Sequence, residues 1–207
     1  VVDSGGTGGP LAAVNGDFET GDLTGWTLFL NDGSITADNT QSNGGSWSGK
    51  LAAGAGHSPL MKQANLGVDS VLPGDVITIS FDMFGSIAGD GGVVFAEFFS
   101  EISPEGVSGT EILGGGAPIF PTNTWTNYSY TAIAGSDVSG GVTLQLKAAC
   151  GAVAGCEVIA YFDNVTISGG TAARIANRTA NRHVCEPTVA AAVPVDFEDA
   201  GAPYTFG

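Results

Sequence analysis

Basic residues are scarce in this sequence. Lysine and arginine together number six against 21 aspartates and glutamates, which gives a net charge of −15 at pH 7 and an isoelectric point near 4.1. A surface this anionic repels phosphate backbones and anionic lipids, which argues against nucleic-acid and membrane-surface partners. Sulfated or uronic polymers are disfavoured too, unless calcium bridges the charges. The sequence also lacks an apolar run of roughly 18 residues, so no segment is predicted to span a bilayer.

Histidine and cysteine are rare as well. The only histidines are His57 and His183, no Cys/His spacing resembles a zinc site, and no Ser-His-Asp arrangement is suggested. Cys150 and Cys156 flank a short Gly/Ala loop, and we predict a local disulfide between them, which is typical of secreted, extracellular proteins. Cys185 is then left to pair outside the domain or to stay free.

No convincing long amphipathic helix is present between residues 14 and 169. Strand-forming residues instead recur in short runs separated by Gly, Asn, Asp and Pro, and 33 of the 207 residues are glycine. This pattern is typical of all-β proteins. With 43% hydrophobic residues the chain can bury a core, so we predict a β-sandwich.

Two segments carry a resemblance to a known family. Asn15-Gly-Asp-Phe-Glu-Thr-Gly is followed by Gly25-Trp26, and a later alternating run ends in Tyr161-Phe-Asp-Asn-Val165. These resemble the opening and closing strands of a carbohydrate-binding module of the galactose-binding-like jelly-roll type. The resemblance covers roughly residues 14–168, and it implies a jelly-roll β-sandwich with carbohydrate binding as the expected function.

Three acids form a candidate metal site. A jelly roll brings its first and last strands together, so Asp17, Glu19 and Asp163 could meet, and Ca²⁺ binds clusters of oxygen ligands. The resemblance implies that Glu19 and Asp163 are the ligands of a structural calcium ion. The alternative is that these acids cap turns or accept backbone amide hydrogens.

A sugar-binding face is predicted from residues that point outward. In the run of residues 76–84, alternation places Ile77, Ile79, Phe81 and Met83 inside. Sugars stack their C–H faces on aromatic rings and exchange hydrogen bonds with planar polar groups. The candidates for this concave face are Trp47, Asp82, Phe84, Glu97, Phe99, Gln145 and Tyr161. Alternatively, the rings pack under loops or against a second sheet.

Catalysis finds little support. Glu97 and Glu101 alternate on one strand, as do Asp196 and Glu198 near the end of the chain. Carboxylates at such positions are ordinary surface groups rather than a glycosidase pair. We therefore expect a protein that is not an enzyme.

The chain divides into four parts. Residues 1–13 form a Gly-rich tail or linker, 14–169 the domain, 170–193 a linker, and 194–207 an extended C-terminal tail. The linker holds Arg174, Arg178 and Arg182, a stripe if helical, and is either solvated or a docking segment. The last part repeats the Asp-Phe-Glu of the opening motif, so it is either the first strand of a following domain or a donated strand.

Two functions remain open. One is a non-catalytic carbohydrate-binding module of a secreted protein that binds neutral, glucan-like polysaccharide. The other is a structural subunit of an extracellular filament, sheath or surface layer, in which residues 193–199 pair with other copies of the chain. Self-association without sugar distinguishes the second from the first.

Overall fold

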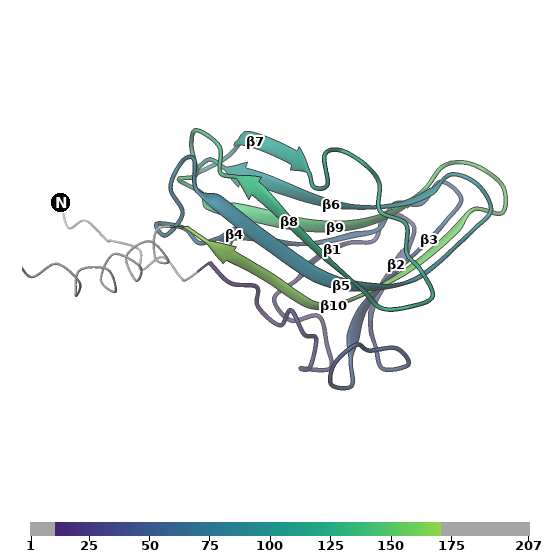
Figure 1. Ribbon diagram of the computed structural model, residues 1–207. Helices are drawn as coiled ribbons and strands as arrows, with labels where there is room; N and C mark the ends of the chain where they lie inside the picture. The colour runs from purple at the N-terminus through teal and green to yellow at the C-terminus, as the bar shows by residue number, and fades with distance from the viewer. Residues whose placement is uncertain (1–10, 171–207) are drawn as a thin grey trace, which may run out of the picture.

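The computed structural model describes residues 11–170, which fold into two stacked antiparallel sheets of five strands each (Figure 1). In spatial order, sheet A consists of β1 (Thr27–Phe29), β4 (Leu60–Leu66), β9 (Val142–Cys150), β6 (Gly92–Glu101) and β7 (Val107–Ile112). Sheet B consists of β2 (Ser34–Asp38), β3 (Ser48–Gly54), β10 (Glu157–Gly169), β5 (Val76–Ala88) and β8 (Thr126–Ile133). The predicted all-β sandwich is confirmed.

Alternation places the core between the sheets. In β5 the side chains of Ile77, Ile79, Phe81 and Met83 are completely buried, as the sequence predicts. They face Phe98 of β6 and the leucines of β9 from the other sheet, which are also buried. The central strands therefore present one apolar face inward and leave their other face available for a site.

Two strands, β4 and β7, were not predicted from the sequence. Both β4 and β7 belong to sheet A, and their sequences are LMKQANL and VSGTEI. Four of the seven residues of β4 are neither leucine nor methionine, and β7 is an edge strand with no buried residue. Neither offers the apolar alternation on which the prediction relied.

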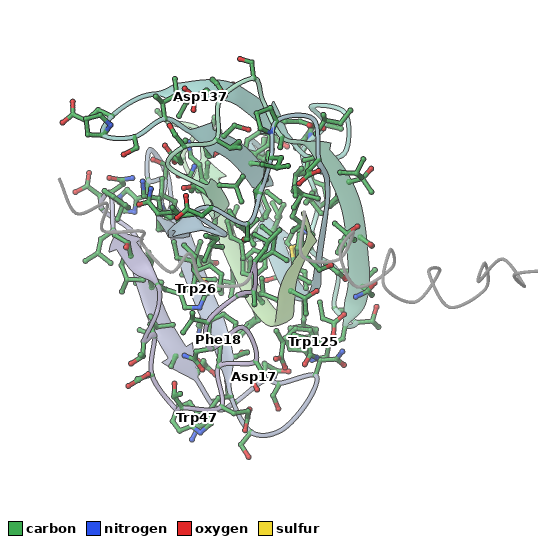
Figure 2. All side chains as sticks on the ribbon, turned by 90° about the vertical axis from the view of Figure 1, so that its left-hand side faces the viewer. Asp17, Phe18, Trp26, Trp47, Trp125 and Asp137 are labelled. Atoms are coloured by element: carbon green, nitrogen blue, oxygen red, sulfur yellow. A yellow bond between two sulfur atoms is a disulfide. The ribbon has the colours of Figure 1, made fainter. Side chains whose placement is uncertain are left out.

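The opening motif is a buried turn rather than the short strand expected of it. Phe18 is fully buried and stacks on Trp26 with ring centroids 5.6 Å apart. Figure 2 labels the two residues close to each other. The Val165 N–H donates to the Gly16 carbonyl at 2.8 Å, where β10 has a bulge. A Cβ on Gly16 would lie 2.0 Å from the Val165 oxygen, so only glycine fits there. The opening and closing motifs therefore do meet.

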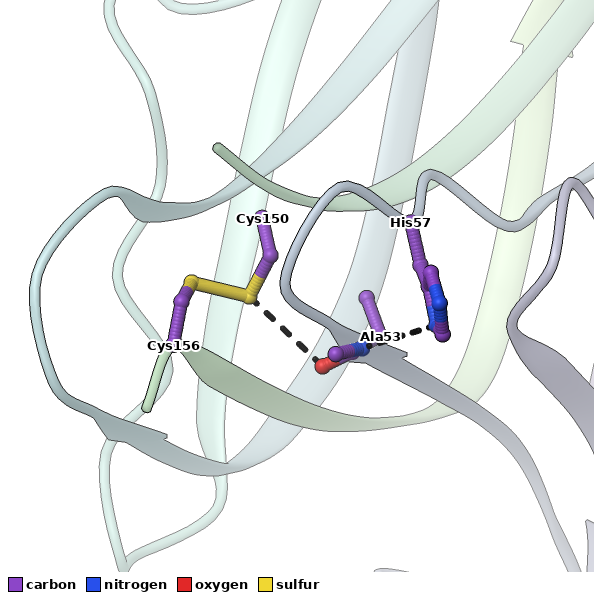
Figure 3. Close-up of a disulfide and its surroundings, with 5 residues drawn as sticks. Ala53, His57, Cys150 and Cys156 are labelled. Atoms are coloured by element: carbon purple, nitrogen blue, oxygen red, sulfur yellow. Dashed lines mark hydrogen bonds between the residues drawn. A yellow bond between two sulfur atoms is a disulfide. The ribbon is translucent and has the colours of Figure 1, made fainter. Parts of the chain in front are cut away.

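A disulfide joins Cys150, at the end of β9, to Cys156, just before β10 (Figure 3). It lies at the core rim, since both cysteines are buried, and Cys150 Sγ is 3.6 Å from the Ala53 carbonyl oxygen. The bridge therefore closes the β9–β10 connection, which crosses between the sheets, and its Cys150 sulfur contacts β3.

Several predictions fall on residues outside the described range of 11–170. These are most of the N-terminal tail, the linker after residue 170, the terminal strand at 193–199 and Cys185. Within the described range, no helix is long and apolar enough to cross a membrane.

Candidate functional site

The predicted sugar-binding residues lie on two opposite faces of the sandwich. Glu97 and Phe99 lie on β6 and Gln145 on β9, all on the outer side of sheet A. Asp82 and Phe84 lie on β5 and Tyr161 on β10, on the outer side of sheet B. The prediction of a single face was wrong, because alternation says that a side chain points outward but not from which sheet.

Trp47 belongs to neither of the two faces. It directly precedes β3, and its ring lies 3.3 Å from where a Cβ on Gly21 would be. Figure 2 shows it at the opposite end of the molecule from Asp137. Trp47 therefore packs over the opening turn, which the turn's glycine makes possible.

The aromatic rings on sheet B pack on one another. The Phe84 ring centroid is 5.6 Å from that of Trp125 and 5.8 Å from that of Tyr161. Tyr161 is only 8% exposed, and Lys50 Nζ lies 5.1 Å from its ring centroid. Lys50 in turn is paired with Asp38 at 3.4 Å. Because Tyr161 is covered in this way, its ring has little surface left to stack on a sugar.

Asp82 is also occupied. Its Oδ1 accepts from the Asn127 side-chain amide at 2.7 Å, and its Oδ2 accepts from those of Asn43 at 2.7 Å and Asn164 at 2.8 Å. Burial alone would raise the pKa of Asp82, but these three amides outweigh it and lower the pKa. A carboxylate with this many partners in place is a structural group rather than a vacant ligand contact.

The three predicted metal ligands are each held by backbone N–H groups instead of gathering. Glu19 Oε1 accepts from the N–H groups of Ser46 and Trp47, both at 2.8 Å. The exposed Asp17 accepts only a long bond, of 3.4 Å, from the Glu19 N–H. Among residues 11–170, no group of three or more His, Cys, Asp or Glu side chains could hold a metal. The predicted cluster of three acids is therefore not formed.

Asp163 is the most deeply buried of these acids, with no exposed surface. It accepts from the N–H groups of Asn43 at 2.7 Å, Gly44 at 3.0 Å and Asn164 at 2.7 Å. Burial raises its pKa, and the carboxylate of Asp82 on the adjacent strand adds to this, although the three N–H groups act in the opposite direction. The surroundings are a nest of donors that suits an anion, so these residues as they stand do not fit a calcium ion.

The outer side of sheet A offers a hollow instead. A cavity of about 640 Å³ lies over β6, β7 and the turn that follows β7, within the usual size range of ligand sites. Phe99 and Ile112 give it apolar surface, and Glu97, Thr110 and Glu111 give it polar groups. Ile112 is 39% exposed, so its side chain is open to a ligand.

Strand register extends this face across the sheet as a polar row. Ile112 of β7 is paired with Glu97 of β6, Glu97 with Gln145 of β9, and Gln145 with Lys62 of β4. The Gln145 side-chain amide donates to the Glu97 carboxylate. Lys62 Nζ lies 5.5 Å from the ring centroid of Phe29 on the edge strand β1. The row therefore runs over the whole width of sheet A and mixes acceptors, donors and apolar surface.

Several residues of this face were missed in the sequence. Lys62, Thr110 and Ile112 lie on β4 and β7, the two strands that were not recognised, and Phe29 lies on the three-residue edge strand β1. The only usable signal was the outward alternation of β6, which singled out Glu97 and Phe99.

Comparisons with known proteins bear on the fold. No protein-family model and no curated protein matches the chain. Among solved structures, the tailspike protein 4 enzymatically active domain of bacteriophage CBA120 is 17% identical, with a TM-score of 0.55 over 77% of this chain and 21% of that one. The CBM22-1 and GH10 modules of a Clostridium thermocellum xylanase, complexed with xylohexaose, are 19% identical, with a TM-score of 0.53 over 77% of this chain and 29% of theirs.

A third similar structure is a family 16 carbohydrate-binding module, 16% identical, with a TM-score of 0.50 over 75% of this chain and 97% of the module. Most of the matched structures are carbohydrate-binding modules. The described domain has their β-sandwich fold. The chain spans only about a fifth of the tailspike domain but corresponds to almost the whole of the single module. At these identities, the likeness establishes the fold alone.

Proposed function

We propose that this chain is a non-catalytic carbohydrate-binding module of a secreted protein and that it binds a neutral, glucan-like polysaccharide on the outer side of sheet A. The observation that carries the proposal is the hollow beside Phe99 and Ile112, which continues into the polar row of Glu97 and Gln145. An aromatic ring next to paired hydrogen-bonding side chains is the chemistry that a sugar ring requires.

The choice of a neutral polymer follows from charge. Glu97 and Glu111 border the hollow, and the chain as a whole carries a net charge of −15. Uronic or sulfated chains would bring further anions to these carboxylates, which costs free energy at short range. Structures with the same fold include one complexed with xylohexaose and one named as a xylan-binding domain, which supports an unbranched neutral chain as the ligand.

Secretion and the lack of catalysis belong to the same proposal. The Cys150–Cys156 disulfide suits an oxidising compartment. On the sugar-binding face, Glu97 accepts a hydrogen bond from Gln145, and Glu101 accepts one from the Thr143 hydroxyl at 2.6 Å. These hydrogen bonds orient both carboxylates, which supports a role in hydrogen bonding to a sugar.

The test is binding to a panel of neutral glycans, namely a β-glucan, a xylan and a galactan, measured by calorimetry and affinity electrophoresis. Phe99→Ala should weaken binding by about 1–3 kcal/mol, the scale of losing one stacked aromatic side chain. Gln145→Ala should also weaken binding, because it removes the side-chain amide that contacts both Glu97 and the sugar.

Phe84→Ala is the matched control. It removes the same side chain from the outer side of sheet B and should leave binding unchanged. If only Phe84→Ala weakens binding, the site lies on sheet B and the assignment to sheet A fails. If the unaltered chain binds none of the glycans, carbohydrate binding itself is refuted, and assembly through the terminal strand becomes the leading alternative.

A further inference from the structure

A second, smaller hollow lies at the end of the sandwich where the described chain ends, away from the proposed sugar face. Its volume is about 360 Å³, and it lies between the turn before β5 and the loop after β8. Val71 and Val138 form a buried apolar floor, while Leu72 stands 48% exposed at its side. Two acids, Asp69 and Asp137, also line it.

Both walls of this hollow are fixed by hydrogen bonds. The Val71 N–H donates to the Gly67 carbonyl at 3.0 Å, which closes the turn that carries Asp69. On the other wall, the Asp137 N–H donates to the Ser108 hydroxyl at 3.1 Å, and Asp137 Oδ1 accepts from the Ser139 N–H at 2.9 Å. Hydrogen bonds from Ser139 lower the pKa of Asp137, so its carboxylate is ionised at neutral pH. Figure 2 looks onto this end of the molecule and labels Asp137.

The chain leaves the described domain at the edge of the hollow. A Cβ on Gly170 would lie 2.9 Å from the Ser70 carbonyl oxygen and 3.5 Å from a methyl carbon of Val71. The residues that follow begin Thr171-Ala-Ala-Arg174-Ile175. Because an extended chain spans at most about 3.6 Å per residue, the Arg174 backbone lies within about 14 Å of Gly170.

Charge complementarity identifies the occupant. Residues 171–185 contain all three arginines of the chain and no acid, whereas residues 11–170 contain 16 of its 21 acids. The only cations of the described domain other than histidine are Lys50, Lys62 and Lys147, and none of them lines this hollow. The two acids thus have no lysine beside them in the hollow, and the nearest arginine along the chain is four residues past Gly170.

We infer that residues 171–182 dock into this hollow, with Arg174 paired to Asp69 and Asp137 and with Ile175 against Leu72. A guanidinium can bond two carboxylates at once, and the exposed leucine supplies the apolar contact that a surface ion pair by itself lacks. Docking would fix the direction in which the chain leaves the domain, and so the position of residues 183–207 relative to the sandwich. The inference does not depend on the proposed sugar site.

The test compares variants of the full chain by hydrogen exchange of residues 171–182 and by the rate of tryptic cleavage after Arg174. A synthetic peptide of residues 171–185 is the fully exposed reference. Cleavage follows the population of the open form, so Asp69→Asn with Asp137→Asn should speed it by about tenfold. The control, Asp32→Asn with Asp90→Asn, removes two exposed acids elsewhere and should change nothing.

Charge exchange separates pairing from a general loss of structure. Arg174→Asp alone should release the segment without changing the melting of the sandwich, and adding Asp137→Arg should restore its slow hydrogen exchange. Because Asp137→Arg also removes the acceptor of the Ser139 N–H, the single variant Asp137→Arg is the reference for melting in the second case. The inference is overturned if the segment in the unaltered chain exchanges as fast as the peptide, or if both pairs of Asn substitutions act alike. Protection that grows with protein concentration would also overturn it, because the arginine would then bind another copy.

Discussion

Removing the ring of Phe18 tests how the opening motif is built into the core. A Cβ on Gly49 of β3 would lie 2.6 Å from this ring and 3.2 Å from the Met61 methyl carbon of β4. Because Gly49 has no side chain, the Phe18 ring can fill the space next to it between the two sheets. We predict that Phe18→Ala and Gly49→Ala each destabilise the domain, and that the two together cost less than the sum of their separate effects.

The magnitudes follow from the contacts. A fully buried phenylalanine cut to alanine costs about 3–5 kcal/mol. Phe18 already has a positive φ of 57°, and alanine is no worse there than phenylalanine. Gly49→Ala forces a methyl group into a buried ring and costs about 1–3 kcal/mol. In the double variant this methyl occupies the space vacated by the ring, so its strain disappears and the coupling should be about 1–3 kcal/mol.

The measurement is denaturant unfolding at fixed temperature, with the free energy of unfolding extrapolated to water. Gly151→Ala is the control, since a Cβ there meets nothing closer than 3.8 Å. Combined with Phe18→Ala, it should be additive to within about 0.5 kcal/mol. If the effects of Phe18→Ala and Gly49→Ala also simply add, the ring does not occupy the space above Gly49 and the account of the opening motif is refuted.

Three further predictions concern ions, pH and the tail. Because backbone N–H groups already occupy the Glu19 and Asp163 carboxylates, a chelator should leave the melting temperature unchanged. If a chelator instead lowers it, and Asp163→Ala removes a calcium stabilisation of about 2.7 kcal/mol at a hundredfold excess over the dissociation constant, the two acids share the ion and this interpretation of their site is wrong. Burial raises the pKa of Asp38, but hydrogen bonds from Thr40 and the charge of Lys50 lower it overall. The ionised Asp38 therefore stabilises the fold above its unfolded pKa, and this stabilisation is lost as pH falls through its folded pKa. In Asp38→Asn the free energy of unfolding should fall less steeply between about pH 5 and about pH 3, and an unchanged slope of this free energy against pH would contradict the assignment. If the terminal strand is donated to another copy, deleting residues 193–207 should abolish assembly, measured by light scattering and electron microscopy. Filaments formed by the truncated chain would rule out assembly through that strand.

Much of the fold could be predicted because its signals are local. Alternation in residues 76–84 put Ile77 and Phe81 in the core, and the tightly spaced Cys150 and Cys156 indicated a disulfide. The resemblance of the opening and closing motifs to the first and last strands of a jelly roll indicated that they meet, and they do so beside the buried Trp26. Each of these inferences needs only neighbouring residues, whose geometry is set by the strand period and by chain connectivity.

The candidate site could be predicted only in part, because it depends on strand order. The sequence showed that Phe84 and Phe99 both point outward, but not that β5 and β6 belong to different sheets, so it placed the two rings on one face. Lys62 reaches the site through the pairing of β4 with β9, across about 80 residues of sequence. Such pairings result from the burial of all the strands at once and leave no local trace.

The sequence by itself determined which side of an alternating strand such as β5 faces the core, since alternating apolar residues can be buried only on one side. The tertiary structure alone decided what the acids do. Glu19 and Asp163 could have bound a cation or accepted backbone N–H groups, and the path of residues 43–47 brings four N–H groups to them. That outcome depends on a loop held between the opening turn and β10, and its position follows from packing across the whole domain rather than from any residue nearby in the chain.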